Sequence, residues 1–432
     1  MKRNLTSIIC INILIVVLLM GCSPKNTVVG SGLSVYLNQN DPMRNIIESY
    51  NLNCDESDKI QITSFRNSEE LSTKISTEMM AGYGPDLITH FSIFGGNLPY
   101  LKFIQKNAFM DIQELIENDN SDDKINFEDL NRVVMDSGIY SGKRVFIPLS
   151  YSAEILLTTK EMCEEYNVIL DPPITYDNIN DRLMTFVTAA KKKNNMYTFV
   201  PISIAFANLI DDDIDIVNKS SNLDSKEFKD NFYRLHDIYI PFKKKNFYQP
   251  NEGLANGTYL FSAMSDMGSR PNITFDFYCD FIKKYSKTPV LVNKFPSKNN
   301  QISAQVDSFL AINNNSQKKE SAYKFIKYAL QYNTQIKLAT NAIPVSNSAY
   351  EYFRENVINF TDVDISQIDV DIENFLNKYE GFVKNINICR LKDAYYLIKI
   401  VSPCLEELFA GKVDEEQCIK NLISKTNIYL NE

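Results

Sequence analysis

The sequence predicts an α/β protein of two domains, in which helices cover the faces of parallel or mixed sheets. First, short apolar runs with strand periodicity alternate with amphipathic helical stripes in the N-terminal part of the chain. Second, the same alternation starts again near Val145. Third, the chain has 432 residues, whereas a single core stops growing at roughly 250–300 residues.

The first series of elements runs from residue 33 to residue 89. The expected strands are residues 33–37, 60–65 and 87–89. Ile46, Ile47 and Tyr50 mark a helix between the first two strands. Asn67 and Glu70 can form a capping box at the start of a second helix, and Gly84-Pro85 prevents that helix from continuing.

The second series is followed by a helical C-terminal part. The expected strands are residues 155–157, 200–204 and 260–264, and the expected helices cover residues 179–190, 322–329, 391–408 and 415–430. An acidic run lies at 211–215 but lacks the glycine and the final glutamate of an EF-hand loop. We interpret it as a solvated loop.

The N-terminus predicts export and a lipid anchor. Lys2 and Arg3 precede an apolar run over residues 8–20, which is shorter than the ~20 residues that a bilayer crossing needs and is typical of a secretory signal. Leu19-Met20-Gly21-Cys22 resembles the bacterial lipobox, in which the cysteine is lipidated. An ordinary signal with a chance cysteine is the alternative. Residues 1–21 are therefore expected to be the signal peptide, and residues 22–32 a lipid-anchored tether.

Composition excludes several classes of function. The formal net charge of −9 argues against nucleic acid as a partner, and against a membrane contact other than the lipid anchor. The six cysteines after Cys22 are widely spaced and form no CxxC pair, so we expect isolated thiols rather than a zinc site, although an exported chain could form a bridge. Motifs of P-loop, zincin and serine-hydrolase type are absent, and neither cofactor nor metal is expected.

Several segments resemble one protein family. Residues 77–88 contain Gly82-Tyr83-Gly84-Pro85-Asp86, which resembles the Gly-x-Gly-Pro-Asp turn of carbohydrate-type extracellular solute-binding proteins, the maltose-binding-protein-like lipoproteins of ABC importers. In that family the aspartate is expected to order the turn. Weaker similarities follow in the family's order at residues 147–151, 157–161, 173–177, 257–264, 321–326, 342–345 and 408–412.

The resemblance implies a two-lobed periplasmic-binding-protein-like fold of type II, with the ligand cleft between the lobes. The first lobe is expected to comprise residues 33–147 plus about 303–343, and the second lobe residues 148–302 plus about 344–432. The implied partners are a small-molecule solute, in the first place a carbohydrate, and the transmembrane subunits of an ABC permease. We expect a monomer on the outer face of the bacterial cytoplasmic membrane.

The ligand site is predicted from the rule that open α/β sheets bind ligands beyond the carboxyl ends of their strands. Asn67 can equally serve only as a helix cap, and Tyr350 is included because it matches a family position where an aromatic residue lines the cleft. Because the chain has no Trp, Tyr or Phe would have to supply the face on which a sugar stacks. The predicted ligand-binding residues are Asn38, Asn40, Asn67, His90, Ser92, Tyr151, Ser152, Phe206, Asp266, Met267 and Tyr350.

The leading functional hypothesis is capture of an extracellular sugar or oligosaccharide for an ABC importer. A co-receptor or an adhesin on the same scaffold would share all of these sequence features. A surface hydrolase is the third possibility, but the sequence contains no recognisable nucleophile or metal motif that would support catalysis.

Overall fold

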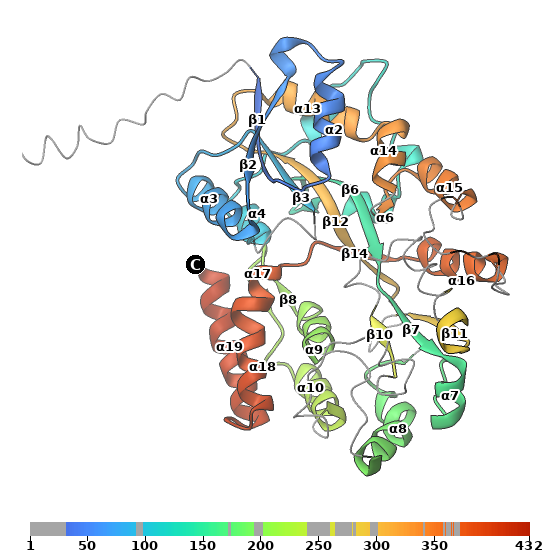
Figure 1. The fold of residues 1–432 in the computed structure, drawn as a ribbon. Helices are drawn as coiled ribbons and strands as arrows, with labels where there is room; N and C mark the ends of the chain where they lie inside the picture. The colour runs from blue at the N-terminus through green and yellow to red at the C-terminus, as the bar shows by residue number, and fades with distance from the viewer. Residues whose placement is uncertain are drawn as a thin grey trace, which may run out of the picture.

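The computed structural model describes residues 32–91, 98–171, 174–193, 202–239, 260–263, 279, 282–293, 301–339, 342–356, 359, 364, 366 and 372–432. These residues form two lobes (Figure 1). We call the lobe with the larger sheet the upper lobe and the lobe with the smaller sheet the lower lobe. The α/β fold class and the two-lobed arrangement agree with the prediction.

The upper lobe contains seven of the described strands in one mixed sheet. β1 pairs in parallel with β2 and β3, whereas β12 runs antiparallel to both β3 and β6 and so lies between them. The order across the sheet is β13 (Ile343–Pro344), β6 (Ile147–Ala153), β12 (Ser303–Ile312), β3 (Leu87–Phe91), β1 (Leu33–Asn38) and β2 (Ile60–Phe65), and β14 (Ile388–Arg390) also pairs with β12.

The lower lobe contains an antiparallel sheet of three described strands, and among the described residues two hairpins lie outside both sheets. The sheet order is β10 (Ser262–Ala263), β7 (Ile155–Thr159) and β11 (Pro289–Asn293). One hairpin joins β4 (Ile139–Tyr140) to β5 (Lys143–Arg144), and the other joins β8 (Ile214–Asp215) to β9 (Ser220–Ser221).

Helices cover both sheets (Figure 1). In chain order they are α2 (Met43–Asn51), α3 (Ser68–Met80), α4 (Tyr100–Gln105), α5 (Gln113–Glu117), α6 (Arg132–Asp136), α7 (Lys160–Tyr166), α8 (Ile179–Lys193), α9 (Ile202–Asp211), α10 (Lys226–Tyr239), α13 (Lys319–Ala329), α14 (Tyr332–Ala339), α15 (Asn347–Glu355), α16 (Ile372–Lys384), α17 (Ala394–Tyr396), α18 (Ser402–Phe409) and α19 (Glu415–Asn431). A π-helical turn, Leu397–Val401, joins α17 to α18.

Each lobe has its own hydrophobic core. The upper core surrounds Phe309 of β12, which is fully buried against the rings of Tyr100 and Phe146 at centroid distances of 5.1 and 4.7 Å. The lower core gathers buried side chains such as Phe232 of α10 and Leu422 of α19. The chain passes from one sheet to the other at Glu154 and between β11 and β12, and after β14 it continues into helices of the lower core. The predicted lobe boundaries stay a prediction.

The Gly-Pro-Asp turn before β3 has the role that the sequence suggests. Gly82 and Gly84 adopt φ values of 81° and 120°, which an L side chain rarely tolerates. Asp86 then accepts hydrogen bonds from the backbone N–H of Ser34 at 2.9 Å and from the hydroxyl of Ser316 at 2.6 Å. This carboxylate therefore ties the turn to β1 and to the segment after β12.

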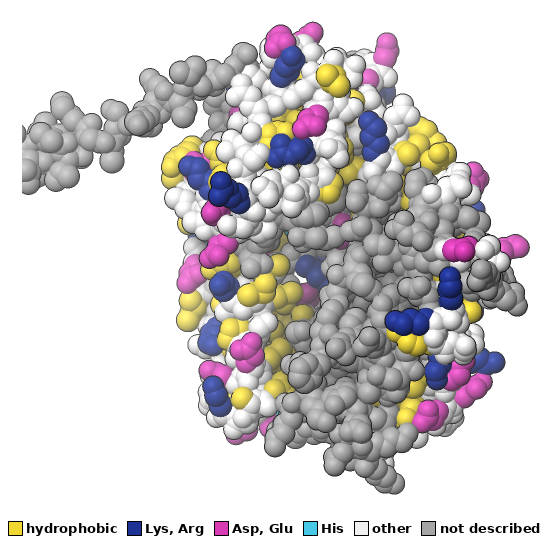
Figure 2. Space-filling model, in the orientation of Figure 1, with side chains coloured by type: hydrophobic (Ala, Val, Ile, Leu, Met, Phe, Trp, Pro, Cys, Tyr) yellow, Lys and Arg dark blue, Asp and Glu magenta, His cyan; other side chains and the backbone are white. Residues whose placement is uncertain are grey.

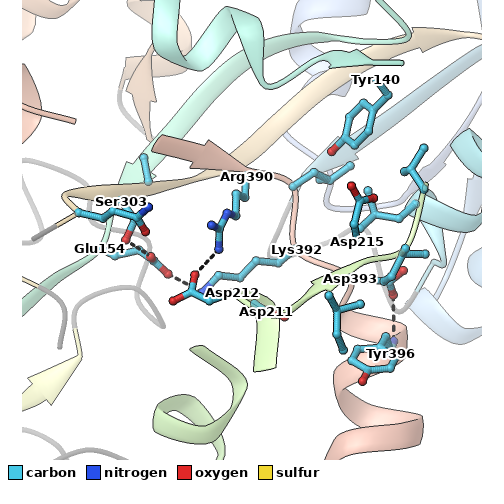
Figure 3. Close-up of a pocket in the computed structure, with 17 residues that line it drawn as sticks. Tyr140, Glu154, Asp211, Asp212, Asp215, Ser303, Arg390, Lys392, Asp393 and Tyr396 are labelled. Carbon is cyan, nitrogen blue, oxygen red and sulfur yellow. Dashed lines mark hydrogen bonds and ion pairs between the residues drawn. The ribbon is translucent and has the colours of Figure 1, made fainter. Parts of the chain in front are cut away.

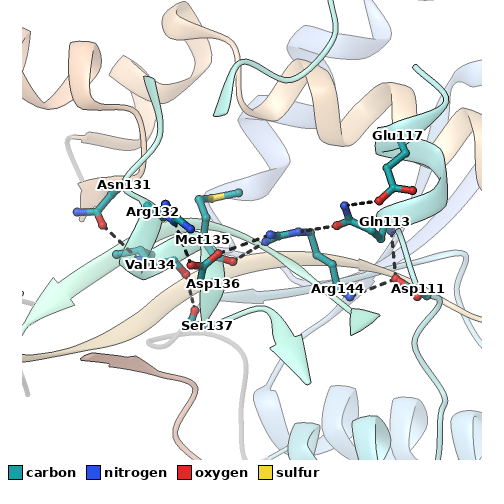
Figure 4. A network of polar contacts seen from close by, with 10 residues as sticks. All are labelled: Asp111, Gln113, Glu117, Asn131, Arg132, Val134, Met135, Asp136, Ser137 and Arg144. Carbon is teal, nitrogen blue, oxygen red and sulfur yellow. Dashed lines mark hydrogen bonds and ion pairs between the residues drawn. The ribbon is translucent and has the colours of Figure 1, made fainter. Parts of the chain in front are cut away.

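Arg144 of β5 is buried, and its contacts fix the segment before β6 (Figure 4). The guanidinium of Arg144 donates to the backbone oxygen of Met135 at 2.6 Å and lies 3.7 Å from the carboxylate of Asp136. Its backbone N–H donates to Asp111 at 3.1 Å, and its Nε donates to Gln113 at 3.4 Å. Arg144 is only 7% exposed, so burial lowers its pKa while the Asp136 carboxylate opposes that change. These contacts hold α5 and α6 against β5.

One predicted strand is wrong. Residues 200–204 were expected to be extended, but α9 begins at Ile202. Phe206 and Asn208 therefore lie within a helix instead of following a strand. The predicted strands at 33–37, 60–65, 87–89 and 155–157 are confirmed, and β10 lies within the predicted strand at 260–264.

Two further findings concern cysteines and membrane spans. None of Cys54, Cys163, Cys279, Cys389, Cys404 and Cys418 takes part in a disulfide, which agrees with the prediction that they form no disulfide framework. Within the described ranges, no helix combines the length and the apolar character that a membrane crossing requires. Acidic and basic side chains are interspersed over the described surface in Figure 2.

Candidate functional site

A cavity of about 320 Å³ lies where the two lobes meet (Figure 3). We call it the hinge cavity. The upper lobe contributes Leu101 of α4 and Tyr140 of β4, and the lower lobe contributes residues 211–217 around β8. The remaining walls come from the segments where the chain passes between the sheets, at Glu154, residues 301–304 and residues 390–393. Both lobes therefore shape this space.

Glu154 links all three passages between the lobes. Its backbone N–H donates to the backbone oxygen of Ser303 at 2.9 Å, and the hydroxyl of Ser303 donates to its carboxylate at 2.5 Å. The other carboxylate oxygen forms an ion pair with Lys392, which follows β14. Glu154 is only 6% exposed, and a buried charge is stabilised by such a partner. The ion pair and the hydrogen bonds fix the three segments relative to one another.

A second ion pair joins the lobes directly. Arg390 at the end of β14 contacts the carboxylate of Asp212, which follows α9 in the lower lobe (Figure 3). The side chain of Asp212 is 9% exposed and that of Arg390 is 36% exposed. Since the lobes can rotate only if this contact changes, the pair is sensitive to lobe orientation.

Asp393 is the most buried carboxylate of the hinge cavity. It is 4% exposed, and it accepts hydrogen bonds from the backbone N–H of Tyr396 at 2.9 Å and from the hydroxyl of Tyr429 at 3.0 Å. The pKa of Asp393 is raised to about 6, chiefly by burial and to a smaller extent by the nearby Asp211 carboxylate, while these two hydrogen bonds oppose the shift.

This shift predicts a pH-dependent contribution to stability. Because the pKa of Asp393 is higher in the folded state than the ~3.9 of an unfolded chain, its stabilising contribution is present below about pH 4 and lost as the pH rises through about 6. Asp393→Asn should remove that loss. The melting temperature of the variant minus that of the parent should therefore increase between pH 4 and pH 7. The exposed Asp215→Asn in the same cavity is the control, and parallel pH curves for parent and Asp393→Asn would contradict the assignment.

The predicted residues of the first three strands lie at the carboxyl edge of the upper sheet. The side chain of Asn38 accepts a hydrogen bond from the backbone N–H of Asn40 at 3.2 Å, which orders the turn after β1. Asn67 accepts a hydrogen bond from the backbone N–H of Glu70 at 2.8 Å and so caps α3. His90 lies against Tyr100 with a ring-centroid distance of 4.9 Å, and burial lowers its pKa to about 4.

Other predicted residues are buried inside the lobes. Tyr151 and Tyr350 belong to the upper core and are 2% and 7% exposed. Phe206 is fully buried in the lower core, 5.0 Å from the ring of Phe232. Ser152 is fully buried, and its hydroxyl donates to the carboxylate of Asp307 in β12. Cys22, Ser92, Asp266 and Met267 lie outside the described residues.

The residues that line the hinge cavity differ from the ligand-binding residues predicted from the sequence. Those predicted residues that the structure describes do not line it. Sequence reasoning missed Glu154, Asp212, Arg390, Lys392 and Asp393, because each becomes notable only through neighbours that are distant in the sequence. The acidic run at 211–215 was interpreted as a solvated loop, whereas Asp211, Asp212 and Asp215 line the hinge cavity. No group of three or more metal-binding side chains is present in the described part of the chain.

The fold and the interlobe cavity define a two-lobed solute-binding protein. A family model described as bacterial extracellular solute-binding protein matches residues 45–360. The chain therefore belongs to this family, whose members act outside the cytoplasm. No curated protein matches this chain in sequence.

Several solved structures have a similar fold. The sugar-binding protein MalE from Xanthomonas citri has a TM-score of 0.64 at 14% identity, with 93% of this chain and 97% of that chain covered. An ABC transporter solute-binding protein from Thermotoga lettingae, bound with alpha-D-tagatose, has a TM-score of 0.58 at 15% identity, with coverage of 92% and 99%. The cyclic alpha-maltosyl-1,6-maltose binding protein from Arthrobacter globiformis has a TM-score of 0.59 at 14% identity, with coverage of 92% and 98%. The fold is that of type II periplasmic binding proteins.

Proposed function

We propose that this protein captures a sugar or an oligosaccharide outside the cell and delivers it to the permease of an ABC importer, without turning it over. The observation that carries the proposal is the hinge cavity, a polar space to which both lobes contribute in a member of the solute-binding family. Lobe rotation around a bound solute is the hinge motion of periplasmic binding proteins. The sugars named for two of the similar structures favour a carbohydrate.

The lining chemistry of the hinge cavity suits a neutral polyhydroxylated ligand. Carboxylates such as Glu154 and Asp393 accept hydrogen bonds, Arg390 and Lys392 donate them, and sugar hydroxyls can do both. Tyr140 contributes an aromatic ring to the same space. The strand-end residues Asn38, Asn40, Asn67 and His90 do not line this cavity, and we propose them as contacts only for a ligand that extends beyond it along the upper lobe. The N-terminal lipid at Cys22 is proposed to keep the protein at the outer face of the membrane, where its permease lies.

A thermal-shift screen tests the substrate class. Maltose, maltotriose, a cyclic glucan and D-tagatose form the sugar arm, and a tripeptide, spermidine and glucose 6-phosphate form the comparison arm. A ligand present at 100 times its dissociation constant stabilises the folded state by about 2.7 kcal/mol. We expect a sugar to raise the melting temperature by several degrees while the comparison arm does not. A shift with the peptide or the polyamine alone would overturn the sugar assignment.

The location of the ligand can be read by fluorescence. Because the chain has no Trp, Ile214→Trp places a single tryptophan in the wall of the hinge cavity. Titration of the sugar found in the screen should change its emission, whereas Leu52→Trp, at a side chain that is 85% exposed in the upper lobe, is the control. Emission that stays constant in Ile214→Trp while the sugar still binds would move the site out of this cavity. Product formed from the sugar would contradict a binding role.

A further inference from the structure

A short helix of the upper lobe binds the end of the last helix of the lower lobe. α4 is anchored in the upper core by Phe103 and Ile104, and α19 is anchored in the lower core by Ile419 and Leu422. Lys102 donates to the backbone oxygen of Tyr429 at 2.6 Å. Gln105 donates to the backbone oxygens of Leu430 at 3.2 Å and Ile216 at 2.6 Å, and Lys106 donates to that of Glu432 at 2.5 Å.

The chemistry of this contact is that of a helix cap supplied by the other lobe. The last four carbonyl oxygens of an α-helix have no partner within the helix, and α19 ends at Asn431. Lysines near these oxygens also favour the negative end of the helix dipole. The ammonium of Lys102 lies 5.0 Å from the centre of the Tyr429 ring as well. Upper-lobe side chains thus complete a lower-lobe helix.

The position of the contact relates it to the hinge cavity. Leu101, next to Lys102, packs against both hydrophobic cores and lines the cavity. Ile216, whose oxygen accepts from Gln105, lines the same wall. Glu154 and Ser303, where the chain passes between the lobes, also line the cavity. The α4–α19 contact and the passages between the lobes therefore border one space.

We propose that Lys102, Gln105 and Lys106 form an interlobe latch that holds the lobes in the orientation of this structure and opens when they rotate apart. Hydrogen bonds weaken steeply once their geometry departs from the preferred range, so these four bonds form together only over a narrow range of lobe angles. The role of the latch in solute binding rests on the proposed function. The latch itself does not, because it acts in the ligand-free protein.

Small-angle X-ray scattering of the ligand-free protein tests the latch. The triple variant Lys102→Met, Gln105→Leu, Lys106→Met should have a larger radius of gyration than the parent. Lys74→Met, which changes an ion pair within α3 of the upper lobe, is the matched control and should scatter like the parent. The single variant Lys102→Arg keeps a cationic donor and leaves Gln105 and Lys106 unchanged, so it should scatter like the parent. Equal radii of parent and triple variant would overturn the proposal.

Two arms separate this proposal from the proposed function. If the triple variant melts without cooperativity, the single variant Lys106→Met replaces it, because truncating an exposed side chain should not prevent folding. A radius of gyration equal to that of the parent would then overturn the latch. Calorimetry with the sugar found by thermal shift compares the affinity of the triple variant with that of the parent. The two affinities should differ by about fivefold or more, because coupling between sites is typically of that size. An enlarged radius with no sugar bound by any variant supports the latch and removes the sugar function. Sugar binding of equal affinity and equal radii leave the function and remove the latch.

Discussion

Replacing Cys22 by alanine should release the protein from the membrane. The tetrad Leu19-Met20-Gly21-Cys22 predicts that the thiol of Cys22 is the site of lipid attachment, and alanine has no thiol to modify. Lipid attachment is all-or-none, so the expected change is the largest of the predictions made for this chain. Fractionation of cells that produce the variant, with labelling by a radioactive fatty acid, measures it.

The matched control is Cys54→Ala, which removes a free thiol from the folded body. That variant should stay in the membrane fraction and keep its label. If Cys22→Ala also stays in the membrane fraction and matures like the parent, the protein is held there by something other than a lipid on Cys22.

Phe309→Ala should lower the free energy of unfolding by about 3–5 kcal/mol, the usual cost of truncating a large aromatic side chain in a core. Phe309 is fully buried at the centre of the upper sheet and lies within ring-contact distance of His90, Tyr100, Phe109 and Phe146. Removing its ring leaves a cavity that four other rings border, and such a site cannot collapse easily. Urea unfolding followed by circular dichroism measures the loss.

The control for this experiment keeps an apolar side chain. Phe309→Leu fills most of the space and should lose clearly less stability than Phe309→Ala. If both variants unfold at the urea concentration of the parent, β12 is not the centre of the upper core.

Much of the upper lobe can be predicted from the sequence because its signals are local. β1, β2 and β3 alternate with helices whose apolar stripes and caps stand within a few residues of each other, and Asn67 caps α3 as its spacing indicates. The strand predicted at residues 200–204 was wrong because a short apolar run is compatible with both a buried strand and a buried helix. Pro201 lies within this run in the sequence, and a proline argues against a central strand, so it was the overlooked signal.

The candidate site is harder to predict because its residues are gathered from the whole chain. Leu101, Glu154, Asp212 and Lys392 share no motif and no element. With 54 acidic residues in the sequence, a single glutamate or aspartate carries no information until its neighbours are known. Phe206 is the opposite case, a residue that the sequence did single out. Its aromatic ring was expected to contact a ligand, but in the structure it packs against Phe232 and Tyr239.

The place of β12 between β3 and β6 has a consequence for how the protein is made. Export through the secretory signal predicted at residues 1–21 would carry the chain across the membrane unfolded and from its N-terminus, so β3 and β6 would emerge long before β12. Phe91 and Ser150 both have Ser308 as their neighbour in the sheet, and neither strand can complete its pairing until that residue has been secreted. Pairing across such a long stretch of chain is slow. We therefore expect the secreted chain to pass through a period in which apolar strand edges are open, when secretory chaperones would protect it from aggregation.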